Sequence, residues 1–188
     1  MRCRIVSTKG NLRYFCAMVF LRPLTPADAE MLATVGGVSL IQSHGHSAPA
    51  PVMQAYVTKS FSVENCRAEL ADPAHIFYGA FYNGEPAGYF KITYRKPHEA
   101  IALQPVTYLE RIYLLQQYLS LKLGHHLLQK AMELSKAAGE KGMWLTVWKE
   151  NKRAIHFYQQ QGFETVGEGK FTLTEAHTNP TWIMLLRY

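Results

Sequence analysis

One stretch, residues 143–163, constrains the fold of this chain more than any other. It opens with an apolar run rich in β-branched and aromatic residues, 143–148, which predicts a buried strand. Asn151 stands where a helix N-cap would, and apolar residues then recur at helical spacing as far as Tyr158. Gly162 predicts the end of that helix before a new strand. The stretch therefore predicts a strand, a short capped helix and a second strand.

The rest of the chain alternates between strand-like and helix-like patterns. Thr25-Pro26-Ala27-Asp28 has the composition of a helix start, whereas Gly36-Gly37 predicts that the first helix breaks or loosens. Asn83-Gly84 between two strand-like runs predicts a hairpin. The pattern predicts strands at 19–24, 75–82, 86–95, 106–115 and 181–187, and helices at 26–35, 52–59, 63–70 and 120–138.

Length and pattern together indicate one mixed α/β domain. A chain of 188 residues fits a single domain with a proper core. The regular pattern begins near Val19. Residues 1–18 are therefore expected to be a loosely ordered N-terminal extension, followed by one domain over 19–188.

Charge narrows the classes of partner. The formal net charge of +6 favours anionic ligands, and both nucleic acid and a polyphosphate cofactor are anionic. The basic residues are scattered along the chain, so a nucleic-acid partner is not expected. No apolar run is long enough to span a membrane. A cytoplasmic protein without a membrane partner is therefore expected.

Neither the cysteines nor the histidines form a recognisable metal pattern. Cys3, Cys16 and Cys66 are odd in number and irregularly spaced, which fits a reduced compartment. His44 and His46 lie in a stretch with loop chemistry and have no third candidate ligand nearby. A flexible loop on the substrate side is favoured over a metal site, and no metal is expected.

The lettering V-W-x-x-N-x-x-A-I-x-F-Y-x-x-x-G-F, residues 147–163, resembles the second acetyl-CoA motif of the GNAT superfamily of N-acetyltransferases. The resemblance runs without a gap. It implies an α/β fold of the GNAT type, with a mixed, mostly antiparallel central sheet of six to seven strands flanked by helices. It also implies that 19–188 is an N-acetyltransferase domain whose cosubstrate is acetyl-CoA.

Residues 106–128 resemble the first acetyl-CoA motif of the same superfamily, in which a loop Gln/Arg-x-x-Gly-x-Gly/Ala precedes a helix. Backbone N–H groups of such a loop point at the pyrophosphate. Only Gly124 matches, and Lys122 replaces the first glycine. If that position requires a positive φ, lysine strains it by about 1 kcal/mol. Phosphate contacts are implied for the backbone of Leu121, Lys122, Leu123, Gly124 and His125, and the Lys122 side chain could add positive charge or point into solvent.

The strand predicted at 106–115 carries a second part of the implied site. In relatives this strand bulges, and its free amides bind the pantetheine arm and the thioester carbonyl. That role falls here on Ile112, Tyr113 and Leu114. The period of two places Tyr108, Glu110, Ile112 and Leu114 on one face. Glu110 is the strand's single carboxylate, and the resemblance suggests that it acts as general base or recognises the amine, directly or through water. The alternative is a surface glutamate paired with a lysine or arginine.

Tyr158 occupies the position of the family's tyrosine. A phenol beside the sulfur can protonate the departing thiolate, whose pKa is about 8.5. The alternative is a packed tyrosine whose hydroxyl binds a backbone group. Asn151 is predicted to cap its helix and, by resemblance, to contact the cofactor.

The resulting hypothesis is an enzyme that moves an acetyl group from acetyl-CoA to a primary amine by direct attack. A small molecule, polyamine or amino acid is favoured over a macromolecule as acceptor. The alternatives are an inactive acyl-CoA-binding domain and an acetyltransferase acting on a protein N-terminus or an aminoacyl-tRNA. The apolar residues 182–186 could pair between subunits as a homodimer or form an internal strand.

Overall fold

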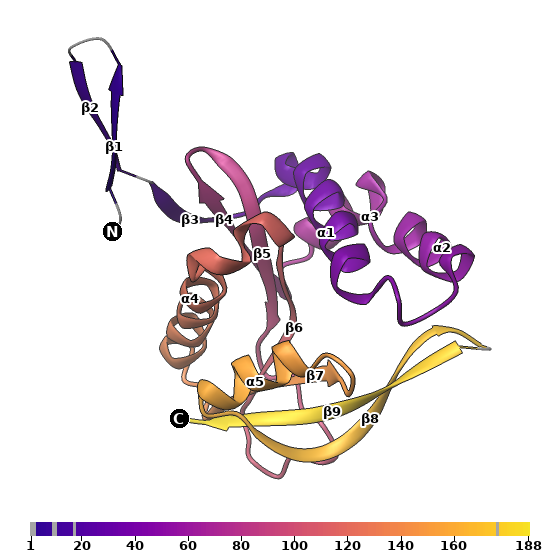
Figure 1. The fold of residues 1–188 in the computed structure, drawn as a ribbon. Helices are drawn as coiled ribbons and strands as arrows, with labels where there is room; N and C mark the ends of the chain where they lie inside the picture. Colours follow the sequence, from indigo (N-terminus) through magenta and orange to yellow (C-terminus); the bar gives the residue numbers. More distant parts are fainter. Residues whose placement is uncertain (1–2, 9–10, 17, 176) are drawn as a thin grey trace.

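A seven-stranded sheet organises the protein (Figure 1). The computed structural model describes residues 3–8, 11–16, 18–175 and 177–188. Across the sheet, the strands run β3-β4-β5-β6-β7-β9-β8, and only β6 and β7 are parallel neighbours. The predicted mixed, mostly antiparallel sheet is thereby confirmed. Its strands are β3 (Val19–Pro23), β4 (His75–Tyr82), β5 (Glu85–Thr93), β6 (Thr107–Leu114), β7 (Gly142–Trp148), β8 (Glu164–Thr174) and β9 (His177–Arg187).

Helices cover both faces of the sheet, because the strands present apolar side chains on both sides. Figure 1 shows α1, α2 and α3 on one side of strands β4–β6 and α4 on the other. Tyr158 of α5 packs into the same core cluster as α4. The helices are α1 (Ala29–His44), α2 (Ala50–Ser60), α3 (Val63–Ala71), α4 (Leu123–Ala137) and α5 (Lys152–Gln160), with short 3₁₀ segments at Pro26–Asp28 and Gln116–Leu121. In the part of the chain that the structure describes, no helix is both long and apolar enough to cross a membrane.

The predicted N-terminal extension contains a separate hairpin. Strands β1 (Cys3–Thr8) and β2 (Asn11–Cys16) pair antiparallel with each other in a sheet of their own. Residues 1–2, 9–10 and 17 and the side chains of Cys3 and Cys16 lie outside the described residues. A loosely ordered extension and a domain spanning 19–188 therefore remain predictions.

The C-terminal strand is internal. β9 pairs with β7 along one edge and with β8 along the other. Residues 182–185 therefore have partners on both sides within the chain, which is the internal strand given above as the alternative to pairing between subunits. Their apolar side chains belong to the core of one subunit rather than to a free edge.

The prediction that Gly36-Gly37 breaks the first helix is wrong, because α1 runs through both glycines to His44. The glycines serve packing instead. A Cβ on Gly36 would collide with the ring of buried Phe61, whereas one on Gly37 would approach Val57 Cγ1 to 3.2 Å. Only a residue without a side chain lets α1 approach Phe61 this closely.

Gly36→Ala is expected to destabilise the fold by about 1–3 kcal/mol, because the buried Phe61 ring must move to admit the methyl group. Gly37→Ala is the matched control on the same helix. Its methyl group finds nearly enough room, and alanine favours a helix over glycine by about 1 kcal/mol. Urea unfolding of the two variants measures the difference, and equal stability would refute this account of Gly36.

Candidate active site

The parallel pair β6 and β7 opens into a gap. The two strands pair only at Thr107–Met143 and Tyr108–Trp144 and diverge beyond these residues. Beyond that point β6 and β7 are no longer hydrogen-bonded to each other. The gap lies where the resemblance placed the acetyl-CoA arm.

A bulge in β6 accompanies the divergence. Lys91 of β5 pairs with Arg111, but the next residue, Ile92, pairs with Leu109. Glu110 is therefore the extra residue of a β-bulge. Such a bulge bends the strand and increases its twist, which helps to turn β6 away from β7.

The prediction that Tyr108, Glu110, Ile112 and Leu114 share one face is wrong because of this bulge. Ile112 and Leu114 pack into the core beneath α4 and α5. Glu110 instead contacts Lys91 and Arg111, which meet Glu69 of α3 on the opposite face. One inserted residue shifts the alternation of every side chain after it.

Backbone donors line the gap on the β6 side. The N–H of Leu115 donates to the carbonyl of Ala87, on the β5 side. Donors in an antiparallel ladder alternate, so the N–H of Tyr113 also faces β5. The N–H groups of Ile112 and Leu114 therefore face the gap. Of the three amides implied by the resemblance, two lie where a ligand in the gap could reach them.

The loop before α4 differs from the predicted helix start at Ser120. Residues 116–121 form a 3₁₀ segment, Lys122 adopts a left-handed conformation with φ 59°, and α4 begins at Leu123. Lys122 therefore has the positive φ under which the sequence analysis expected a lysine to be strained. At the start of α4 the N–H of His125 donates to the Lys122 carbonyl at 3.0 Å, whereas among the described residues the N–H groups of Leu123 and Gly124 have no acceptor, so this end favours an anion.

Gly124 has a packing reason for being glycine. A Cβ there would lie 3.2 Å from Leu114 Cδ1, so its absence lets α4 approach the end of β6 closely. Next to it, His125 Nδ1 lies 3.0 Å from Gln161 Oε1, which links the start of α4 to the end of α5. The helix N-terminus, the two β6 amides and α5 therefore border one gap.

The α5 helix supplies Asn151 and Tyr158. Asn151 Oδ1 accepts a hydrogen bond of 3.1 Å from the Ala154 N–H, which confirms the predicted cap. Tyr158 is buried, and within the described chain its hydroxyl makes no hydrogen bond. The alternative in which that hydroxyl binds a backbone group is therefore not what the structure contains.

Burial, with a smaller contribution from Tyr113, raises the pKa of Tyr158 above its usual value. The phenol consequently stays protonated throughout the neutral pH range. A protonated hydroxyl with no hydrogen bond of its own can donate to a group that enters the gap.

Glu110 belongs to a compact network of charges. Its Oε1 accepts from buried Lys91 Nζ at 2.9 Å and lies 3.4 Å from Arg111 Nη2. Glu69 of α3 pairs with the same two cations, at 2.9 Å from Lys91 and 2.6 Å from Arg111. Glu110 is thus paired with a lysine and an arginine, as in the alternative considered from the sequence. All of these contacts use Oε1, one of its two carboxylate oxygens.

Aromatic side chains gather where β6 and β7 are still paired, just before the gap begins. The Tyr108 ring stacks on Trp144, with ring centres 4.0 Å apart, and burial raises the pKa of Tyr108 and Tyr113. The hydroxyl of Tyr56 on α2 interacts electrostatically with both of these tyrosines. Tyr56 and Tyr113 are both partly buried and pack against the core cluster beneath α1 and α3.

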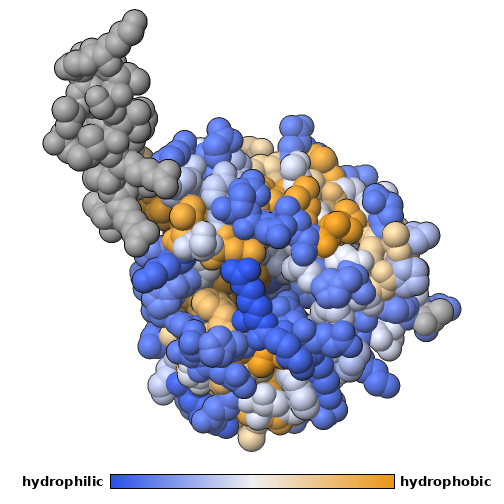
Figure 2. Space-filling model, viewed as in Figure 1, coloured by the Kyte–Doolittle hydropathy of each residue, from blue (hydrophilic) through white to orange (hydrophobic). Residues whose placement is uncertain are grey.

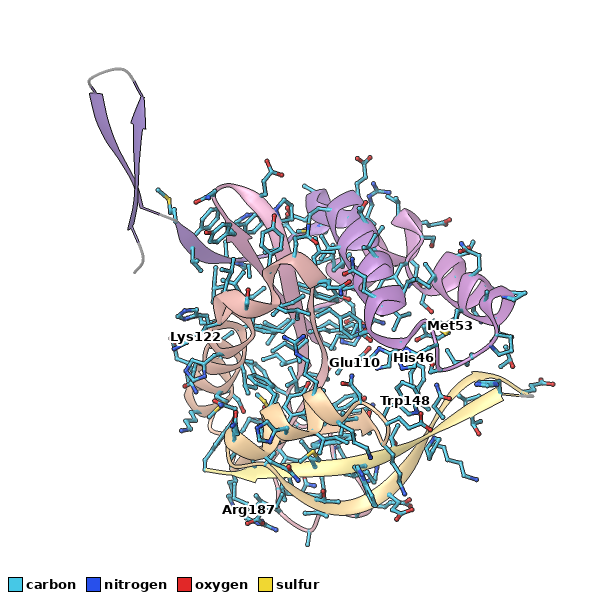
Figure 3. The ribbon with its side chains drawn as sticks, viewed as in Figure 1. His46, Met53, Glu110, Lys122, Trp148 and Arg187 are labelled. Carbon is cyan, nitrogen blue, oxygen red and sulfur yellow. The ribbon has the colours of Figure 1, made fainter. Side chains whose placement is uncertain are left out.

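The α1–α2 loop contains the stretch that the sequence predicted to be a loop on the substrate side, although His44 itself is the last residue of α1. The His44 and His46 rings lie 5.9 and 5.0 Å from the Trp148 ring at the end of β7. His177 Nε2 lies 2.8 Å from the Ser47 carbonyl, and Asn179 Nδ2 donates to Ser47 Oγ at 2.9 Å. Figure 3 shows His46, Trp148 and Glu110 in the region between α1–α2 and β9.

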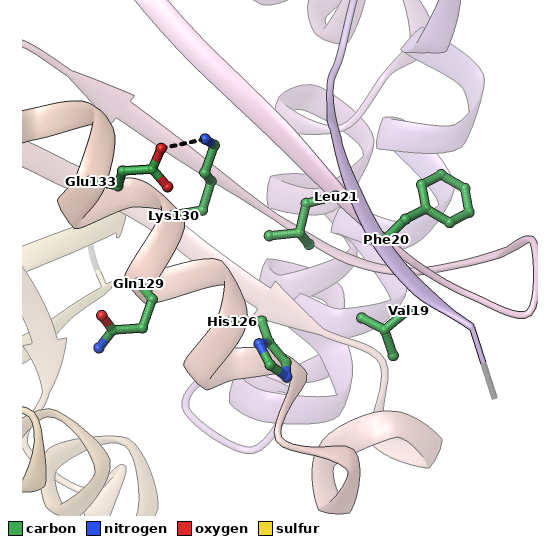
Figure 4. A pocket seen from close by; sticks show the side chains of 7 residues that line it. All are labelled: Val19, Phe20, Leu21, His126, Gln129, Lys130 and Glu133. Carbon is green, nitrogen blue, oxygen red and sulfur yellow. Dashed lines mark hydrogen bonds and ion pairs between the residues drawn. The ribbon is translucent and has the colours of Figure 1, made fainter. Parts of the chain in front are cut away.

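Other surface features lie away from this gap. A hollow of about 540 Å³ lies between β3 and the outer flank of α4, where Lys130 and Glu133 form an ion pair of 2.9 Å (Figure 4). Exposed apolar side chains also occur on α1, at Val38 and Ile41, while hydrophilic side chains dominate the face drawn in Figure 2. Neither feature includes a residue of the predicted site.

Comparison with known proteins identifies the family of this chain. Residues 40–163 match the Acetyltransferase (GNAT) family. A protein of Lactobacillus delbrueckii subsp. lactis, described as an uncharacterized N-acetyltransferase in the pepI 3′ region, is 29% identical over 121 residues, which are 64% of this chain and 70% of that protein.

Two solved structures have a similar fold. The PaiA N-acetyltransferase of Thermoplasma acidophilum, in complex with coenzyme A, superposes with a TM-score of 0.73 at 22% identity, over 91% of this chain and 99% of that one. The ribosomal-protein-S18-alanine N-acetyltransferase of Escherichia coli gives 0.66 at 18% identity, over 90% and 94%. With the family match covering residues 40–163, we conclude that this chain belongs to the GNAT family of acetyltransferases.

Proposed function

We propose that this protein transfers the acetyl group of acetyl-CoA to a primary amine by direct attack. The observation that carries the proposal is the gap between β6 and β7, which the N–H groups of Ile112 and Leu114 face. The Tyr158 hydroxyl, which makes no hydrogen bond within the described chain and is influenced by Tyr113 of β6, is assigned to the same gap. Donors fixed by the backbone need no reorganisation when negative charge develops on a thioester oxygen. The coenzyme A complex of the similar Thermoplasma structure supports this choice of acyl donor.

The phosphates of the donor are assigned to the start of α4. Within the backbone from Leu121 to His125, the N–H groups of Leu123 and Gly124 lie at the helix N-terminus and are assigned to the phosphates, while the His125 N–H already donates to the Lys122 carbonyl. Asn151 caps α5 close to the same gap and is assigned a contact with the cofactor arm. The pantetheine arm would then run between β6 and β7, where Ile112 and Leu114 replace its hydrogen bonds to water.

Two side chains are assigned to the chemistry. Tyr158 protonates the thiolate that leaves when the carbon–sulfur bond breaks. Glu110 is assigned the recognition of the amine, directly or through water, because its second oxygen is left free by Lys91 and Arg111. That second carboxylate oxygen can accept a hydrogen bond from an amine or ammonium group.

A small amine is favoured over a protein or an RNA as acceptor. The contacts from His177 and Asn179 hold the α1–α2 loop against β9, and Trp148 lies beneath that loop. A tethered loop with an aromatic ring beneath it leaves less room for a macromolecular acceptor than for a small amine.

A screen for thiol release tests the proposal. Acetyl-CoA is mixed with amines, polyamines, amino acids, peptides and aminoacyl-tRNA, and free thiol is compared with hydrolysis in the absence of acceptor. Acceleration by a small primary amine is expected. Tight binding of acetyl-CoA without acceleration by any acceptor would identify an inactive acyl-CoA-binding domain and refute the enzyme.

Lys122→Gly separates the two effects of the loop lysine. Glycine accepts the positive φ without strain, so stability is expected to rise by about 1 kcal/mol. If the lysine charge also reaches the phosphates, coenzyme A affinity falls several-fold and its salt dependence weakens. Urea unfolding and calorimetric titration measure the two effects. Lys122→Asn is the control, because asparagine tolerates this conformation and lacks the charge. Unchanged stability of Lys122→Gly would contradict the strain.

A further inference from the structure

We propose that His44 accepts the proton that the attacking nitrogen loses as the new amide bond forms. The inference rests on the proposed acetyl transfer and adds a catalytic residue that neither family motif contains. His44 is the last residue of α1, and its ring lies 6.4 Å from the Tyr113 ring and 5.9 Å from the Trp148 ring. The imidazole therefore lies between β6 and the end of β7, on the acceptor side.

Hydrogen bonding assigns the tautomer of His44. Ser43 Oγ lies 2.7 Å from the Ser39 carbonyl oxygen, which can only accept, so the single hydroxyl proton of Ser43 is donated there. Ser43 Oγ also lies 2.7 Å from His44 Nδ1. With no second proton on the hydroxyl, Nδ1 must carry the hydrogen of this bond and donate it. The lone pair of the neutral ring is therefore on Nε2.

That lone pair is available at neutral pH. Burial, and then the neighbouring His46, lower the pKa of His44 to about 4. The titratable groups that face the ring are His46 on its own loop and Tyr113 on β6. Among the described residues, Nε2 makes no hydrogen bond, so an amine N–H can donate to it without displacing a protein group.

Two electrostatic effects act on the protonated form of the His44 ring. His44 ends a helix of 16 residues, and the C-terminal end of a helix dipole stabilises positive charge. In the free protein, burial outweighs this effect and the ring stays neutral. During attack an oxyanion forms nearby, and this negative charge further stabilises a protonated imidazole.

The protons balance with His44 and Tyr158 in these roles. An ammonium substrate first loses one proton to solvent, and its nitrogen then attacks the thioester carbon. The new carbon–nitrogen bond makes the nitrogen cationic, and its proton passes to His44 Nε2. As the carbon–sulfur bond breaks, Tyr158 protonates the sulfur. Exchange with solvent returns a proton from His44 to Tyr158, leaving an amide, a free thiol and one released proton.

His44→Gln tests the assignment in the full chain. Its kcat in the thiol-release assay is expected to fall about 30-fold, because water replaces the imidazole only in part. The KM for acetyl-CoA and the affinity for coenzyme A should change less than about two-fold. His98→Gln is the matched control, since His98 also packs on a tryptophan, with its ring 4.7 Å from Trp144, but lies outside the gap.

The outcomes separate this inference from the proposed function. A selective loss of kcat in His44→Gln, with full activity in His98→Gln, supports His44. Full activity in both variants overturns His44 alone and leaves acetyl transfer standing. Absence of thiol release by the unmodified protein with every acceptor overturns both proposals. Coenzyme A titration shows whether His44→Gln is folded, and His44→Asn replaces it if it is not.

Discussion

Tyr158→Phe is expected to lower kcat about 100-fold while leaving the affinity for coenzyme A nearly unchanged. Phenylalanine keeps the ring that packs from α5 into the core cluster shared with α4, and it removes only the hydroxyl. That hydroxyl has no hydrogen bond to lose within the described chain, so the substitution leaves no partner unsatisfied. The loss should therefore appear in turnover rather than in folding or binding.

Tyr78→Phe is the matched control for this substitution. Tyr78 belongs to the same side of the core and stacks on Phe90 with ring centres 5.4 Å apart, but it lies on β4, away from the gap. Steady-state thiol release, calorimetric titration with coenzyme A and thermal unfolding are measured for both variants. Equal turnover of Tyr158→Phe and the unmodified protein would remove Tyr158 from the mechanism.

The same rate loss should persist across neutral pH. Because burial raises the pKa of Tyr158, its proton is fully present throughout this range. The unmodified enzyme should accordingly lose no activity between pH 7 and 9 through titration of this group. A decline of kcat in that interval that disappears in Tyr158→Phe would contradict the raised pKa.

The parts of the fold that the sequence predicted are those decided by local chemistry. The strand predicted at 143–148 (β7, Gly142–Trp148), the cap at Asn151 and the end of the helix at Gly162 depend on a run of buried apolar residues, one side-chain hydrogen bond and one positive φ. The Asn83-Gly84 hairpin is equally local, with φ of 53° and 89° at its two residues. Such signals act within a few residues, so they can be read from the sequence itself.

The errors arose where distant contacts decide. Glycine weakens an isolated helix, but Gly36 is retained within α1 because Phe61 occupies the space of its missing side chain. The bulge at Glu110 depends on how β5 and β6 pair, and a strict period of two cannot register one inserted residue. His44 gains its neighbour Trp148 from a strand about one hundred residues further on, which no local pattern indicates.

The bulge at Glu110 also determines how the candidate site is arranged. It turns Glu110 away from the face of Ile112 and Leu114, which leaves two amides on the cofactor side and the carboxylate among Lys91, Arg111 and Glu69. The one bulged residue thus separates the backbone N–H groups assigned to the cofactor from the carboxylate assigned to the amine. A regular β6 would place the carboxylate in the core with the apolar residues.

Lys91→Met is expected to destabilise the protein by about 3 kcal/mol at pH 7. Lys91 is 2% exposed and balances Glu69 and Glu110, each 2.9 Å from its ammonium group. Methionine fills a similar volume but leaves Arg111 as the single cation for two partly buried carboxylates. One uncompensated negative charge then remains out of bulk water, and that cost dominates the change.

The pH dependence and a double variant identify charge as the cause. Burial raises the pKa of Glu69, but Arg111 and Lys91 outweigh it, so the folded-state pKa lies below the unfolded one. This stabilisation is present above the usual glutamate pKa of about 4.3 and declines as pH falls below it. The deficit of Lys91→Met should therefore shrink on acidification, as protons neutralise the unpaired carboxylates.

Lys91→Met/Glu69→Leu should recover part of the stability, because Arg111 then balances Glu110 alone. The control is Lys130→Met, which breaks an exposed pair with Glu133 and should cost far less stability than Lys91→Met. Urea unfolding at pH 7 and pH 5 measures all three variants. A deficit of Lys91→Met that is independent of pH and unrelieved by Glu69→Leu would mean that lost packing, rather than charge balance, makes Lys91 necessary.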